Sequence, residues 1–149
     1  MSRIPIKINQ KTLAKTSSQH GFVGDIEDLT QANENFRKVL YTGKNIQLVL
    51  MAIQPGDEIG EETHADRDQF FRIEGGSGEV WIDGHRSKIE GDDGVIVPAG
   101  ARHNIVNTGD KPLRLYTIYG PPEHRDGLVQ ATKPDADADE EHFDGKTTE

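Results

Sequence analysis

The fold is decided by residues 56–76, GDEIGEETHADRDQFFRIEGG, where polar donors and strand-like alternation lie between glycines. Glu62 and His64 are two residues apart, so in a β-strand their side chains share one face. Gln69 follows His64 at an odd step of five residues, and it shares that face only if residues 65–68 make a turn or bulge. We predict this turn, and with it the convergence of Glu62, His64 and Gln69.

A second polar stretch, PAGARHNIVN at residues 98–107, begins with a turn signal and continues as a strand. Alternation places His103, Ile105 and Asn107 on one face of that strand. We predict that this face points into the interior of the protein. His103 would there meet the donors of residues 56–76.

The two stretches resemble the two sequence motifs of the cupin family. The first family motif is a Gly, five residues, His-x-His, three or four residues, a Glu, six residues and a Gly. Gly56 and Gly76 keep this spacing, whereas Glu62 replaces the first His and Gln69 replaces the Glu. The resemblance implies a double-stranded β-helix, which is the jelly-roll barrel of this family.

The second family motif opens with a Gly and ends in Pro-x-Gly, two residues, a His, three residues and an Asn. Residues 98–107 match this ending in full. The opening Gly is expected at position 92, which is Asp92, and Gly91 stands one residue early. The departure concerns a loop and leaves the second-motif histidine in place.

The resemblance implies one divalent metal ion held by Glu62, His64, Gln69 and His103. The usual family set of three neutral imidazoles and one carboxylate leaves such an ion with a net charge of plus one. Two imidazoles, one carboxylate and one amide oxygen keep that balance here. These nitrogen and oxygen donors suit Zn, Mn, Fe or Ni, and we expect Gln69 to be the weakest contact. The alternative is a metal-free barrel in which Glu62 and Gln69 hydrogen-bond the histidines.

Short strand-like segments separated by turns indicate an all-β fold. Residues 36–42 and 46–53 flank GKN at residues 43–45, which predicts a hairpin. Further short strands follow at the spacing of an antiparallel sandwich or barrel. We therefore expect a single cupin domain over residues 1–149, with its barrel core at about 36–120.

The segments outside the barrel core have weaker patterns. Residues 4–8 alternate like a short strand within an N-terminal extension, and residues 24–36 fit either one strand or a short helical turn. Residues 121–149 are expected to form a loop and an acidic tail. We expect the tail to be solvated or loosely helical, with Phe143 as its contact to the barrel.

Charge and composition exclude several classes of protein. The formal net charge is −9, of which residues 135–149, with seven acidic side chains and one Lys, supply −6. The absence of a basic stripe disfavours nucleic acid as a partner. The chain has no cysteine, no long apolar run and no signal-peptide pattern, so we expect no membrane association and a cytoplasmic location.

Alternation also predicts which side chains line the barrel. Gln69, Phe71 and Ile73 would point inward, with their neighbours facing outward. Ile105 and Leu115 would extend the same inner surface. Apolar side chains around a few polar groups are typical of a small-molecule pocket.

Several residues outside the metal set are candidates for other roles. Tyr116 and Tyr119 point to opposite faces of one strand, and the inward one would offer a phenolic proton, although a structural role is favoured. His124 would act as a proton shuttle if its loop capped the barrel mouth, but we favour a surface histidine. Arg67 would meet an anionic substrate at the rim, but a solvated charge is favoured. Trp81 is expected to pack against a barrel face or a partner subunit.

Three functions are compatible with the resemblance. The first is a metal-dependent enzyme on a small polar or aromatic molecule, either a dioxygenase with iron or an isomerase or lyase with a non-redox ion. The second is a non-catalytic small-molecule-binding cupin, and the third is a barrel with a structural metal. An open coordination position would exclude the third, and turnover would separate the first from the second. We predict the enzyme, as a homodimer.

Overall fold

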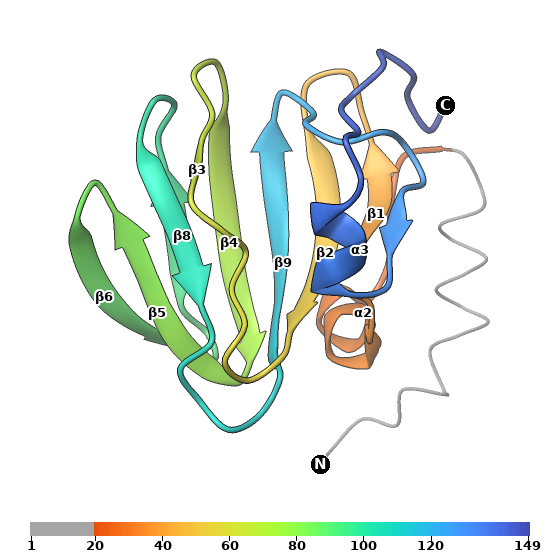
Figure 1. Ribbon diagram of the computed structural model, residues 1–149. Helices are drawn as coiled ribbons and strands as arrows, with labels where there is room; N and C mark the ends of the chain where they lie inside the picture. Colours follow the sequence, from red (N-terminus) through yellow and green to blue (C-terminus); the bar gives the residue numbers. More distant parts are fainter. Residues whose placement is uncertain (1–19) are drawn as a thin grey trace.

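The computed structural model describes residues 20–149, so the strand predicted at residues 4–8 lies outside the described part of the chain. Two antiparallel sheets enclose one hydrophobic core (Figure 1). The elements are α2 (Ile26–Ala32), β1 (Arg37–Thr42), β2 (Gln47–Ile53), β3 (Glu62–Thr63), β4 (Asp68–Gly75), β5 (Ser77–Ile82), β6 (His85–Glu90), β7 (Gly94–Val97), β8 (Arg102–Val106), β9 (Leu113–Gly120), β10 (Val129–Gln130) and α3 (Lys133–Asp137). The strand order is β10-β1-β2-β9-β4-β7 in one sheet and β3-β8-β5-β6 in the other. The predicted all-β jelly roll is confirmed.

The first two strands form the predicted hairpin. β1 and β2 pair from Arg37 opposite Met51 to Thr42 opposite Gln47. The backbone N–H of Gly43 donates to the carbonyl oxygen of Ile46 over 2.8 Å and closes the turn. β2 then pairs with β9 along its whole length, so the hairpin is part of the larger sheet.

Residues 24–36 adopt the helical alternative. Asp25 caps the N-terminus of α2 by accepting a hydrogen bond of 3.1 Å from the backbone N–H of Asp28. α2 packs against β2, β4 and β9 on the outer face of the larger sheet. Leu50 and Ala52 point to that outer face, and both are buried, so β2 is covered on both sides.

The predicted alternation of β4 is confirmed. Gln69, Phe71 and Ile73 have exposed fractions of 4%, 1% and 0% and face the core. A turn at residues 65–66 precedes the strand, as the odd step between His64 and Gln69 required. The inner face of β4 therefore combines one buried amide with two apolar side chains.

The loop with the altered cupin glycine keeps the backbone conformation that favours glycine. Asp92 has a φ of 77°, and its side chain accepts a hydrogen bond of 3.1 Å from Arg72 Nη2. Asp tolerates the left-handed region better than most residues, although it still carries a steric cost there. Position 92 thus keeps the backbone conformation that favours glycine, although the residue there is Asp.

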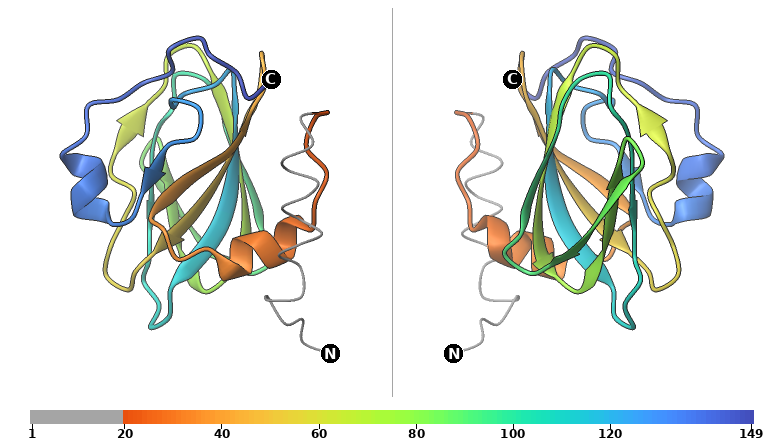
Figure 2. Two further views of the ribbon diagram at one scale, coloured as in Figure 1. Left: turned by 90° about the vertical axis from the view of Figure 1, so that its right-hand side faces the viewer. Right: turned by 90° about the vertical axis from the view of Figure 1, so that its left-hand side faces the viewer.

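The C-terminal tail was expected to be solvated or loosely helical, with Phe143 as its contact to the barrel. Residues 133–137 form the short helix α3, and most of the later residues are exposed. The backbone N–H of Phe143 donates to Glu123 over 2.9 Å, and that of Thr148 donates to Thr42 over 2.9 Å. The tail therefore runs over one end of the barrel (Figure 2), with the expected contact at Phe143 and a second contact at Thr148.

Trp81 packs against its own barrel face. Its indole N–H donates to Glu79 Oε1 over 3.0 Å, and the guanidinium of Arg86 lies 4.2 Å from the ring centroid.

Among residues 20–149, no helix is long and apolar enough to cross a bilayer.

Candidate metal centre

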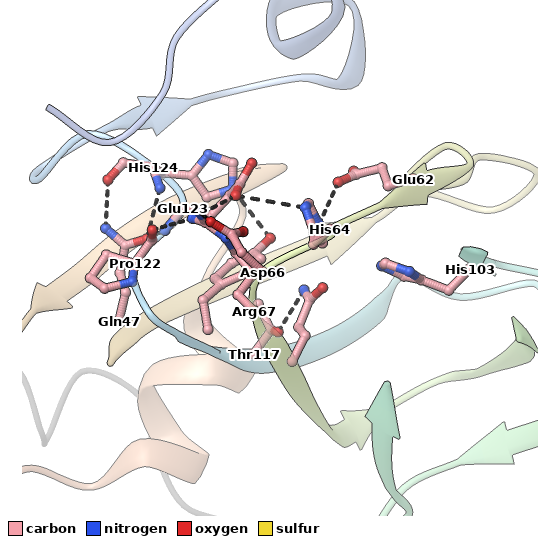
Figure 3. Close-up of polar contacts among 12 residues, drawn as sticks. Gln47, Glu62, His64, Asp66, Arg67, His103, Thr117, Pro122, Glu123 and His124 are labelled. Atoms are coloured by element: carbon pink, nitrogen blue, oxygen red, sulfur yellow. Dashed lines mark hydrogen bonds and ion pairs between the residues drawn. The ribbon is translucent and has the colours of Figure 1, made fainter. Parts of the chain in front are cut away.

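The predicted donors come from three strands that meet inside the barrel. β3 pairs with β8 so that Glu62 lies opposite His103, and His64 follows directly after β3. The rings of His64 and His103 have centroids 5.4 Å apart. Gln69 projects inward from β4 of the other sheet. Figure 3 shows His64 between Glu62 and Glu123, with His103 directed toward the same space.

His103 is oriented through Nδ1, which lies 3.0 Å from the carbonyl oxygen of Ala101 and donates a hydrogen bond to it. Histidines that bind metals almost always donate the other ring N–H to a carbonyl or carboxylate. His64 lies between two carboxylates, with Nε2 3.0 Å from Glu62 Oε2 and Nδ1 3.6 Å from Glu123 Oε1. The Ala101 contact therefore leaves Nε2 of His103 free, whereas Nε2 of His64 faces Glu62.

Gln69 is oriented in the same manner. Its Nε2 donates to the Thr117 hydroxyl over 3.0 Å, and that hydroxyl donates to the carbonyl oxygen of Phe70 over 2.8 Å. Gln69 Oε1 is buried and has no hydrogen-bond partner. An unsatisfied buried oxygen costs free energy, about 1–3 kcal/mol, unless something else binds it.

Glu62 and His64 have a spacing that is compatible with one shared ion. His64 Nε2 forms an ion pair of 3.0 Å with Glu62 Oε2. Two donors about 3 Å apart have the separation of two ligands on one ion, since each ligand bond measures about 2.0–2.2 Å. In the metal-free alternative, both Glu62 and Gln69 hydrogen-bond the histidines. Gln69 instead donates to Thr117 and contacts neither histidine through a hydrogen bond.

The charges of the site favour an ionised Glu62. Burial raises the pKa of its carboxyl, but His64 and, at longer range, Arg37 outweigh burial and hold the pKa below the usual value. Glu62 in turn raises the pKa of His64, with a contribution from Glu123, although burial opposes this. Protons therefore compete with a metal for His64.

The carboxylate and the two imidazoles do not form a complete metal site by themselves. Within residues 20–149, no group of three or more His, Cys, Asp or Glu side chains is arranged to hold a metal ion. A complete site would need a closer approach of Glu62, His64 and His103, with the amide oxygen of Gln69 as a further donor.

Tyr119 and His124 lie together at the barrel mouth. Tyr119 is the inward tyrosine, with 2% of its surface exposed, whereas Tyr116 faces outward against Phe70. His124 Nε2 lies 3.2 Å from the Tyr119 hydroxyl, and His124 Nδ1 lies 2.5 Å from Glu141 Oε1. The favoured interpretation of His124 as a surface histidine is wrong, because the loop and the tail bury it to 7% exposure.

Arg67 is also not a solvated charge. Its side chain is 17% exposed and forms an ion pair of 2.9 Å with Glu123 as well as one of 2.9 Å with Asp66. It also donates to the carbonyl oxygen of Pro122. Arg67 thereby fixes Glu123, which in turn orients His64.

Sequence reasoning missed three residues near the site, of which Gln47 is fully buried and Glu123 and Glu141 are partly buried. Glu123 and Glu141 lie in segments with no strand pattern, so no periodic signal marks them. Gln47 accepts from the backbone N–H groups of Glu123 and His124, and it donates to the carbonyl oxygen of His124. Its inward position follows from strand alternation with Val49, which was an available signal.

Comparison with known proteins gives a consistent result. Residues 49–119 match the family model described as "Cupin domain". The chain is 41% identical to the uncharacterized protein YrkC of Bacillus subtilis, over 89% of this chain and 75% of the relative. It is 31% identical to the polyketide synthase CurC of Streptomyces cyaneus, over 48% of this chain and 47% of the relative.

A solved structure resembles the whole barrel. The crystal structure of BH2720 from Bacillus halodurans superposes with a TM-score of 0.80 at 42% identity, and it covers 83% of this chain and 98% of that chain. The motif spacing, the two-sheet barrel and these similarities agree. The chain belongs to the cupin family.

Proposed function

We propose that the protein is a metal-dependent enzyme that acts on a small molecule by isomerase or lyase chemistry. One observation carries this proposal: Gln69 Oε1 is a buried oxygen on the inner face of the barrel and has no hydrogen-bond partner. The amide nitrogen of the same side chain is held by Thr117. A side chain that is fixed at one end and unsatisfied at the other supports a role as a ligand.

The chain's own residues would divide the work between holding the ion and shaping the pocket. The ion would be held by Glu62, His64, Gln69 and His103. When bound, a divalent ion supplies a Lewis acid that polarises an oxygen atom of the ligand. Phe71 and Ile105 would exclude water from the interior, because both are fully buried beside the donors. Exclusion of water strengthens every polar contact with a bound molecule.

Proton transfer would involve Tyr119 and His124. The hydroxyl of Tyr119 lies 3.2 Å from His124 Nε2, and Glu141 orients the imidazole through Nδ1. A base oriented by a carboxylate next to a buried hydroxyl supports proton movement at the Tyr119 oxygen. A relative whose name refers to polyketide synthesis supports small-molecule chemistry in general terms. With iron in place of a non-redox ion, dioxygenase chemistry is the alternative.

Elemental analysis of protein purified without exposure to metal-affinity resin tests the proposal. We expect about one equivalent of a divalent metal per chain in the parent. His64→Ala and His103→Ala should each lose it, whereas Gln69→Ala should only weaken retention. His85→Ala is the matched control, because His85 is exposed and lies outside the site.

Equal metal content in the parent and all three site variants would refute the ligand assignment. Zinc, manganese or nickel in the parent would direct activity screening to sugar phosphates and related hydroxy compounds. Iron would direct it to diols and catechols. No uptake after reconstitution would replace the proposal with the metal-free barrel.

A further inference from the structure

Arg37 is a buried cation on the inner face of the barrel. On β1 it lies opposite Met51 of β2 and opposite Gln130 of β10, and both of these residues are buried. Met51 belongs to the hydrophobic core, so the pairing directs Arg37 to the interior. Only 7% of its surface is exposed.

The guanidinium group is held by neutral groups, and its Cζ lies over the Phe36 ring, 5.2 Å from the ring centroid. Nη1 donates to the amide oxygen of Gln130 over 2.6 Å, which is a neutral partner. Nε is buried and has no hydrogen bond. Arg67 offers a contrast, since it pairs with the carboxylates of both Asp66 and Glu123. Within residues 20–149, no carboxylate lies within ion-pair distance of Arg37.

A buried charge without a counterion is costly, and proteins rarely retain one. The fork formed by Nε and Nη2 remains available because Gln130 engages only Nη1. Two parallel N–H groups match the two oxygens of a carboxylate in bidentate geometry. The unused edge of Arg37 therefore has the geometry of an anion site.

Arg37 belongs to the same interior as the metal donors. Burial raises the pKa of Tyr119, and the charge of Arg37 is the foremost influence that opposes this rise. Tyr119 belongs to the same core cluster as Met51, which pairs with Arg37, and its ring centroid lies 5.8 Å from that of His64.

We propose that Arg37 binds the carboxylate group of a small organic acid inside the barrel, next to the metal donors. The inference deepens the proposed function, on which it rests, by naming the substrate class. A single guanidinium with one free pair of N–H groups favours a monoanionic carboxylate over a dianionic phosphate. The ligand would then lie between Arg37 and the metal donors.

Nuclear magnetic resonance of the full chain provides the test, since the Nε–H signal of Arg37 can be observed directly in a protein of 16.5 kDa. The probes are propionate, uncharged propionamide and methylphosphonate. We expect propionate to shift this signal in a saturable manner, with propionamide giving no shift and methylphosphonate binding more weakly. Arg37→Gln should weaken propionate binding about tenfold or more. Lys38→Gln, which removes the same charge from the neighbouring position of β1 on its opposite face, should change it less than about threefold.

Several outcomes would overturn the proposal. They are an unchanged Nε–H signal with propionate, an equal response to propionamide, or tighter binding of methylphosphonate. If Arg37→Gln does not fold, the titration of the parent protein alone decides. Repeating the titration with one equivalent of Zn²⁺ separates the two proposals. Propionate binding without Zn²⁺ uptake leaves the Arg37 site intact and removes the metal enzyme, and Zn²⁺ uptake without propionate binding does the reverse.

Discussion

Thr117 is the residue on which the orientation of Gln69 depends. Its hydroxyl accepts from Gln69 Nε2, and this bond turns Oε1 toward the interior. Thr117→Val keeps the volume but removes the acceptor, so we expect metal affinity to fall about tenfold, as is usual when a ligand loses its supporting partner. Thr117→Ser, which keeps the hydroxyl, is the matched control. Zn²⁺ titration by calorimetry measures both, and equal affinities in the two variants would contradict this role.

Single residues differ in how well the sequence predicts them. Gln69 was predictable because its inward position follows from alternation and one turn. His124 was not, because its burial depends on Glu141, which lies 17 residues away in a segment without a pattern. Arg37 was hidden for another reason: a charged side chain on a strand favours the outer face. Only the pairing with β2 reverses that preference.

The loop between β6 and β7 keeps a glycine conformation without glycine. Asp92 has a φ of 77° there, which costs an ordinary side chain about 1 kcal/mol. We expect Asp92→Ala to lower the free energy of unfolding by about 1 kcal/mol, because Ala tolerates this region less well than Asp. Asp92→Gly should leave stability unchanged or raise it slightly. Urea denaturation measures the difference, and equal stability of the Ala and Gly variants would show that the backbone relaxes.

At the scale of whole strands, prediction succeeded where two signals agreed. The hairpin of β1 and β2 had both alternation and a turn sequence, and the barrel strands had regular spacing with glycines between them. Residues 24–36 offered a strand and a helical turn with equal support. The capping contact of Asp25 and the packing of α2 on the larger sheet decide for the helix. Tertiary packing therefore settled the case that local sequence left open.

The C-terminal tail links the stability of the whole molecule to pH. Burial raises the pKa of Glu141, but its hydrogen bonds with His124 and with the backbone N–H of Arg125 hold the pKa below the usual 4.5. Glu141 therefore contributes stability above pH 4.5, and this contribution is lost as the pH falls through its lower native pKa. We expect Glu141→Gln to be less stable than the parent at pH 7, with a difference that shrinks in acid. Urea midpoints at both pH values measure this.

Glu140→Gln is the matched control for this experiment, since Glu140 is exposed and adjacent. It should follow the parent at both pH values. A constant difference between Glu141→Gln and the parent across the pH range would disprove the role of the ionised carboxylate.

The homodimer and the cytoplasmic location stay predictions at this scale.

The position of the tail also has a consequence for the speed of binding. Glu141 lies against His124, which lies against Tyr119, so a molecule that approaches the interior from this end must first separate the tail from the barrel. Its association rate would then be limited by how often the tail opens and not by diffusion. At high ligand concentration, the observed rate would reach a plateau equal to the opening rate. Opening of the acidic tail would thus set the rate at which a ligand enters the barrel.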